Sequence, residues 1–264
     1  MNLDPAMLGR VRRADSEPAF TTNSLDVPVP WYREVAPWQR SAKRAMDIGL
    51  SLVGLALFAL VLPLLALAIK IDSRGPIFYN QQRVGINRRR RDRRHQKADL
   101  FGHERRHPTD SRDDRKVVAE GRLFAIHKLR TMYVDSEADG VRWATKGDPR
   151  ITRVGRVLRQ CRLDELPQFW NVLRGDMSLV GPRPERPPFI TQLSSEIPGY
   201  LIRLRFRPGI TGLAQVESGY DDGLKSVEKK VELDLHYMRK YSLRSDIRIL
   251  LRSFGVVFTG KGAC

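Results

Sequence analysis

Two adjacent carboxylates, Asp164 and Glu165, lie in the segment CRLDELPQFWNVLRGD, just after a group of regularly spaced arginines. The arginines recur at every third position and can therefore follow one side of a helix. They are Arg153, Arg156, Arg159 and Arg162. Guanidinium groups bind phosphate through paired hydrogen bonds, whereas carboxylates bind Mg²⁺ together with phosphate oxygens or attack phosphorus themselves. The combination predicts a diphosphate site in which the acids bind Mg²⁺ or one of them acts as a nucleophile.

Further basic side chains are held by restricted backbone. Arg183 stands between two prolines in GPRPERPP, and Arg207 precedes a Pro-Gly pair. Proline fixes its own torsion, so a neighbouring side chain has less freedom to lose on binding. A strand predicted at 121–132, in GRLFAIHKLRTM, adds Lys128 and Arg130. We expect these four residues to contact phosphate.

A purely structural role for the two acids is the alternative. In LDELPQFWNVLRG, Asp164 suits the N-cap of a short helix, Pro167 its first turn and Gly175 its end. Glu165 would then interact favourably with the helix dipole. Taken alone, this interpretation is the simpler one, and only the basic surroundings favour chemistry.

The composition of the 264-residue chain restricts its partners. Lys and Arg number 47 against 30 acids, a formal net charge of +17. This excess predicts anionic partners: nucleic acid, an acidic membrane surface or phosphorylated small molecules. The two cysteines, Cys161 and Cys264, lack metal-ligand spacing. A disulfide framework and a zinc site are therefore not expected, and a reducing compartment fits best.

One segment, residues 48–69, contains no charged residue. A helix of that length would rise about 33 Å, close to the thickness of a hydrocarbon core. Pro63 lacks a backbone N–H and predicts a break or kink. Basic residues flank the segment on both sides, and positive residues mark the cytoplasmic side of a membrane. We therefore predict a re-entrant helix hairpin that bends near Pro63 and returns, with a single spanning helix as the alternative.

These features predict an α/β (α+β), helix-rich catalytic domain at 75–264, preceded by a leader at 1–40 and the membrane segment at 41–74. Within the domain, residues 88–120 have few apolar side chains and dense charge of both signs, which is typical of a flexible basic insertion. Near the C-terminus, 243–258 predicts an amphipathic helix with an apolar stripe opposite Arg244, Arg248 and Arg252. That helix could lie in a membrane interface or pack on the core.

Several motifs in this order resemble the bacterial sugar transferase family, the monotopic polyprenyl-phosphate phosphoglycosyl transferases. They are KRAMD, GPIFYNQQRVG, HKLRTM, DPRITRVGRVLR, LDELPQFWNVLRGDMSLVGPRPE and RPGITGLAQV, and they extend over residues 41–262. The resemblance implies transfer of a sugar phosphate from a UDP-sugar to a polyprenol phosphate such as undecaprenyl phosphate, with release of UMP. Such a reaction would begin cell-surface glycan or exopolysaccharide synthesis at the bacterial inner membrane, with the catalytic domain on the cytoplasmic face.

The resemblance also implies roles for individual residues. The family's covalent phosphosugar would form on Asp164, with Glu165 assisting the binding of Mg²⁺ or the handling of a proton. Other matched positions would contact phosphate, bind the nucleotide or begin the membrane helix. They are Lys128 and Arg159 for phosphate; Pro182, Arg183, Pro184 and Arg207 for the nucleotide turns; and Lys43, Arg44 and Asp47 for the membrane helix.

Two departures from the family pattern concern the membrane segment and the insertion. Leu62 stands where the family usually has serine before the proline, so the predicted break lacks one hydroxyl. The insertion at 88–120 replaces a short turn. No large multi-spanning domain precedes the catalytic part, so the chain resembles the minimal form of the family. The transferred sugar is open, as is the oligomeric state, for which a homodimer is one option.

The competing hypothesis from another class is a membrane-tethered nucleic-acid-binding or scaffold protein. It would use RRRRDRR and the other arginines on phosphate backbones. The two hypotheses differ in where the basic residues matter, around the acids for an enzyme and in the insertion for the competitor. We expect an enzyme with a UDP-sugar, a polyprenol phosphate and membrane lipids as partners, and no nucleic acid.

Overall fold

The computed structural model describes residues 35–86, 117–118, 121–137, 147–218 and 223–259. Most of the predicted leader and insertion lies outside these residues. The helices and strands, with η for 3₁₀ helices, are α1 Pro37–Asp72, β1 Phe78–Val84, β2 Val117–Val118, β3 Gly121–Leu129, α2 Arg153–Gln160, η3 Leu163–Glu165, α3 Gln168–Arg174, β4 Ser178–Val180, α4 Pro187–Glu196, η4 Tyr200–Arg205, β5 Gly209–Thr211, α5 Leu213–Glu217, α6 Leu224–Arg239 and α7 Leu243–Thr259.

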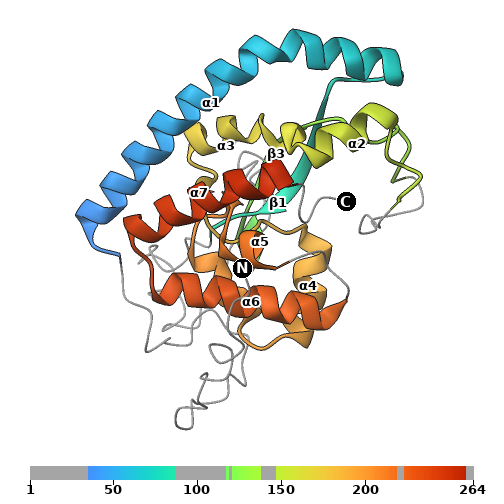
Figure 1. Cartoon of the computed structure of the whole chain (residues 1–264). Helices are drawn as coiled ribbons and strands as arrows, with labels where there is room; N and C mark the ends of the chain where they lie inside the picture. The colour runs from blue at the N-terminus through green and yellow to red at the C-terminus, as the bar shows by residue number, and fades with distance from the viewer. Residues whose placement is uncertain (1–34, 87–116, 119–120, 138–146, 219–222, 260–264) are drawn as a thin grey trace, which may run out of the picture.

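Two small sheets form the centre of a helix-rich fold (Figure 1). β1, β3 and β2 form an antiparallel sheet in that order, with Phe78 opposite Leu129 and Val84 opposite Leu123. β4 and β5 pair in parallel. The helix-rich mixed fold and the strand predicted at 121–132, which is β3, are confirmed. β2 lies within the predicted insertion at 88–120, so the end of that range belongs to the sheet.

Helices cover these sheets through two main apolar clusters. One cluster lies between the sheets and the last two helices and includes Val172, Met177, Tyr237 and Ile249. The other joins α4, η4 and α6. Burial of such side chains supplies the main driving force for folding. A third cluster, which includes Phe58 and Ile69 of α1, packs against Leu163 and Leu166 on either side of the acids.

α1 is one continuous helix that passes through Pro63 (Figure 1). The predicted break into a hairpin is therefore not confirmed. A proline removes one backbone donor and crowds the preceding turn, which bends a helix but ends it only where the flanking turns have no other support. Here Phe58 and Ile69, on either side of Pro63, are both buried against the domain. Packing on both sides of the proline accounts for the continuity.

The first half of α1 is bonded to the domain by the KRAMD segment. Lys43 lies 2.7 Å from Asp246 of α7, and the Arg44 guanidinium donates to two carbonyls at the end of α3. Asp47 is buried and accepts hydrogen bonds from the Ser178 hydroxyl and the Leu179 N–H. Lys43, Arg44 and Asp47 thus hold the helix to the protein itself, a role that the sequence did not indicate.

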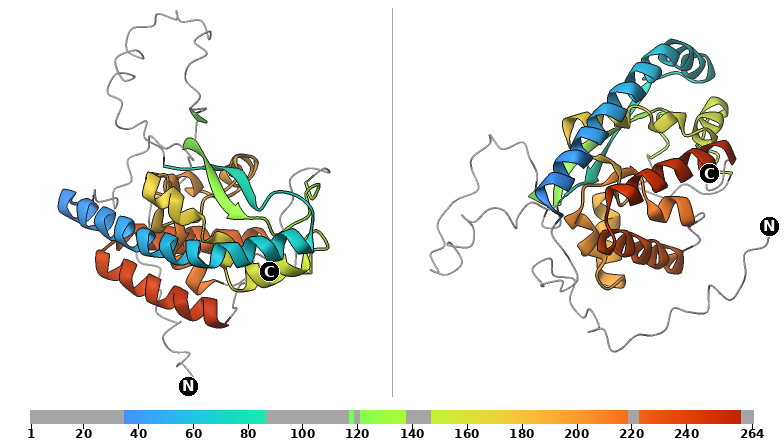
Figure 2. Two further views of the ribbon diagram at one scale, coloured as in Figure 1. Left: turned by 90° about the horizontal axis from the view of Figure 1, so that it is seen from above. Right: turned by 60° about the vertical axis from the view of Figure 1, so that its left-hand side comes forward.

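The remainder of α1 also lies on the domain. A Cβ on Gly54 would come within 2.6 Å of the Phe169 ring, so α1 and α3 approach closely at this glycine. Asp72, at the last turn, accepts a hydrogen bond from the Val154 N–H at the start of α2. Figure 2 shows α1 running along the domain beside α7. Both ends of the apolar helix are therefore attached to one side of the protein.

α7 has the predicted extent, but its inward face differs from the predicted apolar stripe. Asp246 and Ile249 are buried, whereas Ile247, Leu251 and Phe254 are exposed. The prediction left open whether the apolar stripe packs on the core or lies in a membrane interface. Asp246 lies inside because it pairs with Lys43 and accepts a hydrogen bond from the Tyr237 hydroxyl. Buried charges need such partners. Part of the predicted stripe is therefore an apolar row on the outer surface of α7.

Candidate active site

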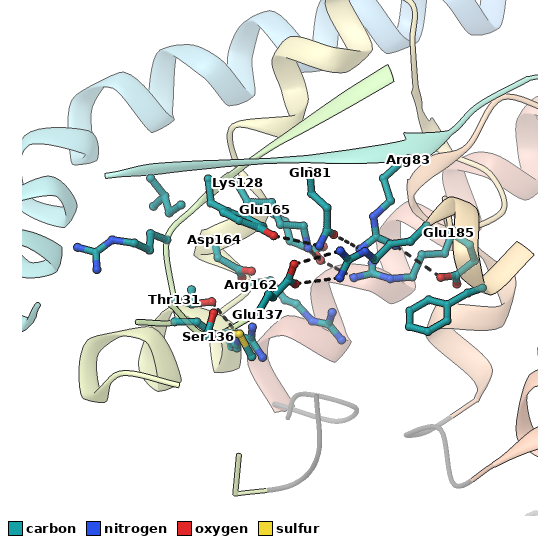
Figure 3. Close-up of a pocket in the computed structure, with 18 of the residues that line it drawn as sticks. Gln81, Arg83, Lys128, Thr131, Ser136, Glu137, Arg162, Asp164, Glu165 and Glu185 are labelled. Carbon is teal, nitrogen blue, oxygen red and sulfur yellow. Dashed lines mark hydrogen bonds and ion pairs between the residues drawn. The ribbon is translucent and has the colours of Figure 1, made fainter. Parts of the chain in front are cut away.

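A cavity of about 460 Å³ opens between β1, β3, the segment after β3, η3 and the 182–186 segment (Figure 3). Both acids line it, as do several of the predicted phosphate-binding residues. These are Lys128, Arg130, Arg159, Arg162 and Arg183. Segments distant in the sequence thus bring one anionic pair and a group of cations to a single hollow.

The acids sit on a short 3₁₀ helix that follows a strained residue. Arg162 has φ 57°, the only positive φ of a non-glycine residue in the described ranges, and such a conformation costs of order 1–3 kcal/mol. Asp164 and Glu165 follow and are each only 7% exposed. α3 begins after Pro167 without a side-chain cap. The interpretation of Asp164 as a helix cap is therefore wrong, whereas the predicted stop at Gly175, with φ 84°, is confirmed.

Glu165 is held by two cations from different segments. Its Oε1 lies 2.8 Å from Arg183 Nη2 and 3.3 Å from Lys128 Nζ. Burial alone would raise the pKa of Glu165, but Arg183, Lys128 and Arg162 together lower it well below its usual range. The carboxylate is thus fixed as an anion whose oxygen is already occupied. Through these two ion pairs Glu165 links Lys128 of β3 to Arg183 of the proline-rich loop.

Asp164 differs from its neighbour because its carboxylate is unoccupied. Among the described residues, no hydrogen bond or ion pair involves its side chain, which faces the cavity. Burial raises the pKa of Asp164, and Glu165 adds to the rise, while Lys128, Arg159 and Arg162 oppose it. The pKa of Asp164 lies above its usual value because burial outweighs the three cations. A desolvated carboxylate without a protein partner is available to a ligand.

The loop of residues 182–185 presents Arg183 to this pair and is held by hydrogen bonds from other segments. Each carbonyl in it accepts a hydrogen bond of 2.9–3.0 Å. The donors, in chain order of the carbonyls, are Gly209 N–H, Arg203 Nη2, Arg83 Nη1 and Val84 N–H. The rigid presentation of Arg183 expected from the flanking prolines is thus completed by bonds from three other segments.

Arg203 and Asp234 support this loop from inside the protein. Arg203 lies 2.8 Å from Asp234 of α6 and donates to the Tyr200 hydroxyl at 3.2 Å, and both charged residues are buried. Burial raises the pKa of Asp234 to about 6, although Arg203 opposes the rise. Sequence reasoning missed this pair. The available signal was a charge inside the apolar run YLIRLRF.

Comparison with known proteins identifies the architecture around this cavity. The model of the family described as bacterial sugar transferase matches residues 38–93 and 108–260. This is most of the chain. It belongs to the bacterial sugar transferase family.

Individual relatives of this sugar transferase family are similar over most of the chain. The UDP-N-acetylgalactosamine-undecaprenyl-phosphate N-acetylgalactosaminephosphotransferase of Aeromonas hydrophila is 39% identical over 221 residues, 84% of this chain and 44% of its own length. The UDP-glucose:undecaprenyl-phosphate glucose-1-phosphate transferase of Caulobacter vibrioides is also 39% identical, over 84% of this chain and 71% of its own. The Escherichia coli protein of the same name is 38% identical over 85% of this chain and 42% of its own length. The chain thus spans less than half the length of two of these relatives.

The family match refines the predicted insertion. It omits residues 94–107, a shorter stretch within the predicted 88–120. This agrees with the pairing of β2 with β3 at 117–118. The family model thus matches the remainder of the predicted insertion, residues 88–93 and 108–120.

Not every predicted binding residue is free to bind phosphate. Arg159 lines the cavity and donates to Thr131 Oγ1 at 2.9 Å. Arg130 also lines it, but its guanidinium donates to Ser73, Arg74 and Pro76 just after α1, a geometry that does not favour a phosphate role. Arg207 is not among the residues that line this cavity. Arg153 and Arg156 are exposed to solvent, whereas Arg159 and Arg162 line the cavity. Only the second half of the predicted row of arginines therefore reaches the site.

A divalent cation fits the two acids only in part. In the described residues no group of three or more His, Cys, Asp or Glu side chains could hold a metal ion. Mg²⁺, however, needs only one or two carboxylates when phosphate oxygens and waters complete its shell. Asp164 has free oxygens for this, whereas an oxygen of Glu165 is shared with Arg183 and Lys128. Asp164 would therefore supply the first contact and Glu165 at most its remaining oxygen.

Proposed function

We propose that this protein transfers a sugar-1-phosphate from a UDP-sugar to a polyprenol phosphate through a phosphosugar ester on Asp164. The observation that carries the proposal is the contrast between the two acids. Glu165 is fixed by two cations, while the Asp164 carboxylate faces the cavity without a partner in the described residues. A nucleophile must be open to its electrophile, and a neighbouring anion must be neutralised for a phosphate to approach.

In the first step, an ionised Asp164 oxygen attacks the phosphorus that bears the sugar. A bond forms between this oxygen and phosphorus, and the bond to the bridging oxygen breaks, so that UMP leaves with the electron pair. Lys128, Arg159 and Arg183 surround the position of the transferred phosphate and stabilise its charge. Mg²⁺, when bound, would neutralise phosphate oxygens.

In the second step, a phosphate oxygen of the polyprenol phosphate attacks the same phosphorus. The bond to Asp164 breaks, the carboxylate is restored, and a polyprenyl-diphospho-sugar is released. The relatives named above carry two different sugars in their names at the same identity. Likeness in sequence therefore does not select the sugar.

The experiment that tests this proposal is UMP release from a UDP-sugar in the absence of acceptor. The wild type should release UMP in an amount limited by the enzyme, and Asp164→Asn should release none. Glu165→Gln is the matched control, because it keeps a side chain between Arg183 and Lys128 and should slow the release without abolishing it. Turnover by Asp164→Asn at the wild-type rate would exclude the ester.

The metal proposal has its own measurement. Addition of EDTA to the wild type should lower UMP release by at least about tenfold, and Mg²⁺ should restore it. Direct titration of the protein with Mn²⁺, followed by electron paramagnetic resonance, should show binding that Asp164→Asn weakens. Equal binding to both proteins would place the metal elsewhere.

We further propose that α1 lies lengthwise on the cytoplasmic face of a bacterial membrane. α1 is long and apolar enough to cross a membrane, yet it is attached to the domain at Lys43 and at Asp72. From Leu50 to Ile71 its outer surface is apolar except for the exposed Lys70. The exposed apolar side chains are Leu50, Leu52, Val53, Leu57, Leu60, Val61, Leu64, Leu67 and Ile71. If α1 contacts lipid along this surface, the basic residues before and after its apolar segment both stay on the cytoplasmic side of the membrane, and no hairpin is needed.

The exposed row on α7 continues this surface, because α7 lies beside α1 (Figure 2). Ile247, Leu251 and Phe254 would enter the interface, and Arg248 and Arg252 would bind anionic headgroups. Cysteines placed at Trp38 and at Arg74 should both react with an impermeant reagent in inverted vesicles. Reaction at only one of them would indicate a spanning helix.

The competing function is tested by removing residues 94–107, which the family match omits. An enzyme should retain UMP release within about twofold after this deletion. A nucleic-acid-binding protein should lose RNA affinity instead, measured at two salt concentrations because phosphate contacts depend on salt.

A further inference from the structure

The cavity has a second polar region that the proposed reaction does not use. It is formed by Tyr79 and Gln81 of β1, Glu137 of the segment after β3, and Arg186, the residue before α4; all four line the same cavity as Asp164 (Figure 3). We call these four residues the Glu137 cluster. They come from three segments of the chain, so the fold and not local sequence brings them together.

Arg186 holds Glu137 in one orientation. Its Nη1 and Nη2 donate to the two carboxylate oxygens at 2.8 and 3.0 Å. A carboxylate has about four lone-pair positions, and a bidentate arginine occupies two of them. The Glu137 side chain is 34% exposed and lines the cavity, so acceptor positions remain for a ligand.

Tyr79 and Gln81 add an oriented hydroxyl. Gln81 Oε1 accepts from Arg83 at 2.5 Å, which fixes the amide so that its Nε2 donates to the Tyr79 hydroxyl at 3.2 Å. Because this hydroxyl oxygen already accepts, its own proton remains available to a ligand or to Glu137. The Tyr79 ring is partly exposed in the cavity wall. The cluster thus offers fixed acceptors, a hydroxyl and an aromatic face.

This set of groups matches a polyol better than a nucleobase. Two neighbouring hydroxyls can both donate to one carboxylate, while their oxygens accept from arginine or tyrosine, and an aromatic ring can cover the C–H face of a sugar. Uracil has a single N–H donor and two carbonyl acceptors. It would leave acceptor positions on Glu137 unpaired, which is unfavourable in a partly desolvated site.

We propose that the Glu137 cluster is a subsite for a vicinal diol of the donor, with Glu137 accepting from both hydroxyls. The inference rests on the proposed function, because it takes a nucleotide sugar as the ligand. Such a donor contains two polyols of this chemistry, the ribose of the nucleotide and the transferred sugar. Glu137 would act on binding and orientation and form no covalent bond.

The test compares donor kinetics of the full-length wild type and Glu137→Gln in lipid nanodiscs. The substitution preserves size but removes one acceptor, so KM for the UDP-sugar should rise at least about tenfold while kcat stays within about threefold. Glu217→Gln is the matched control. It breaks an ion pair of similar length, 2.9 Å to Arg252, between residues that do not line the cavity, and should change neither constant.

Two further arms distinguish the sources of the diol. If the ribose is bound, wild type should be inhibited more strongly by UMP than by 2′-deoxy-UMP, and Glu137→Gln should lose this difference. If the transferred sugar is bound, inhibition by UMP should be unchanged in Glu137→Gln, while the preference between UDP-glucose and UDP-galactose changes. Either result supports the subsite.

Other outcomes overturn it. If Glu137→Gln lowers the melting temperature or aggregates, Tyr79→Phe decides, because it removes one hydroxyl and should raise KM about threefold or more. KM values within twofold of wild type for Tyr79→Phe and for any folded Glu137→Gln, with every donor, would reduce the cluster to a structural contact while the transferase function stands. A wild type that releases no UMP from any UDP-sugar would overturn the function and the subsite together.

Discussion

The 182–185 loop and α1 both contain proline, but only the loop has the conformation that its prolines predict. In the 182–185 loop, the backbone keeps the rigid presentation of Arg183 that the prolines predict. In α1, the helix continues through Pro63 where the same chemistry predicts a break. The two regions differ in what surrounds the proline. The loop receives hydrogen bonds on every carbonyl from outside, whereas α1 is pressed against the domain on both sides of Pro63.

The comparison teaches that a proline sets only local torsions. In the loop, tertiary hydrogen bonds and local torsions favour the same conformation. In α1, tertiary packing of an apolar face outweighs the loss of one backbone hydrogen bond. The surroundings therefore decide which structure is built, and substitutions in those surroundings should have larger effects than substitutions of the prolines.

The largest effect is expected from removing the support of the loop. Asp234→Ala leaves the Arg203 guanidinium buried and without its carboxylate, which should lower the free energy of unfolding by about 3–5 kcal/mol. Urea unfolding followed by tryptophan fluorescence measures this. Asp234→Asn keeps the shape and should cost less. If both variants were as stable as wild type, the loop would not depend on its buried pair.

The next effect tests what the loop presents. Arg183→Lys retains the charge but loses the forked geometry that meets Glu165, so UMP release should fall about 10- to 100-fold. Arg174→Lys is a suitable control, because Arg174 is more than half exposed and lies outside the cavity. Equal losses in both variants would show a general effect of arginine replacement.

A smaller effect is expected where α1 rests on α3. Gly54→Ala would place a methyl group 2.6 Å from the Phe169 ring and should cost about 1–3 kcal/mol of stability. Gly49→Ala is the matched control in the same helix, since no atom lies within 4 Å of its added Cβ. That substitution should be neutral or slightly stabilising. Thermal unfolding of both variants in one detergent makes the comparison.

The smallest effect should come from the proline that was expected to matter most. Pro63→Ala restores a backbone donor to a helix that is already continuous, so UMP release should stay within about twofold of wild type. The sidedness of labelled Trp38 and Arg74 positions should be unchanged as well. A variant that changes sidedness would restore the hairpin interpretation and contradict the packing account.

Much of the site followed from local sequence patterns. Spacing and turn chemistry identified the acid pair, the end of α3 at Gly175, and the residues Lys128 and Arg183 that meet at Glu165. The end of α3 and the residues around the cavity could be anticipated because periodicity and proline or glycine torsions are properties of a few neighbouring residues. The roles of these residues in phosphate binding and catalysis stay predictions.

The failures concern contacts between distant segments. No local pattern reveals that Asp246 turns inward to meet Lys43, or that Arg203 and Asp234 find each other beneath the loop. The raised pKa of Asp164 is likewise hidden from the sequence, because burial is a property of the assembled fold. Asp164 and Glu165 are neighbours in the sequence, and only tertiary contacts make them differ. Glu165 pairs with Lys128 and Arg183, whereas Asp164 faces the cavity.

The double attachment of α1 has a consequence for the lipid environment. A helix that crosses a bilayer must match both hydrocarbon boundaries, and mismatch tilts or strains it. α1 is fastened to the domain at Lys43 and at Asp72, so in the proposed arrangement a single leaflet sets its depth. The cavity that contains Asp164 would then keep a constant height above that leaflet, and we expect the rate of UMP release to be insensitive to acyl-chain length while responding to headgroup charge.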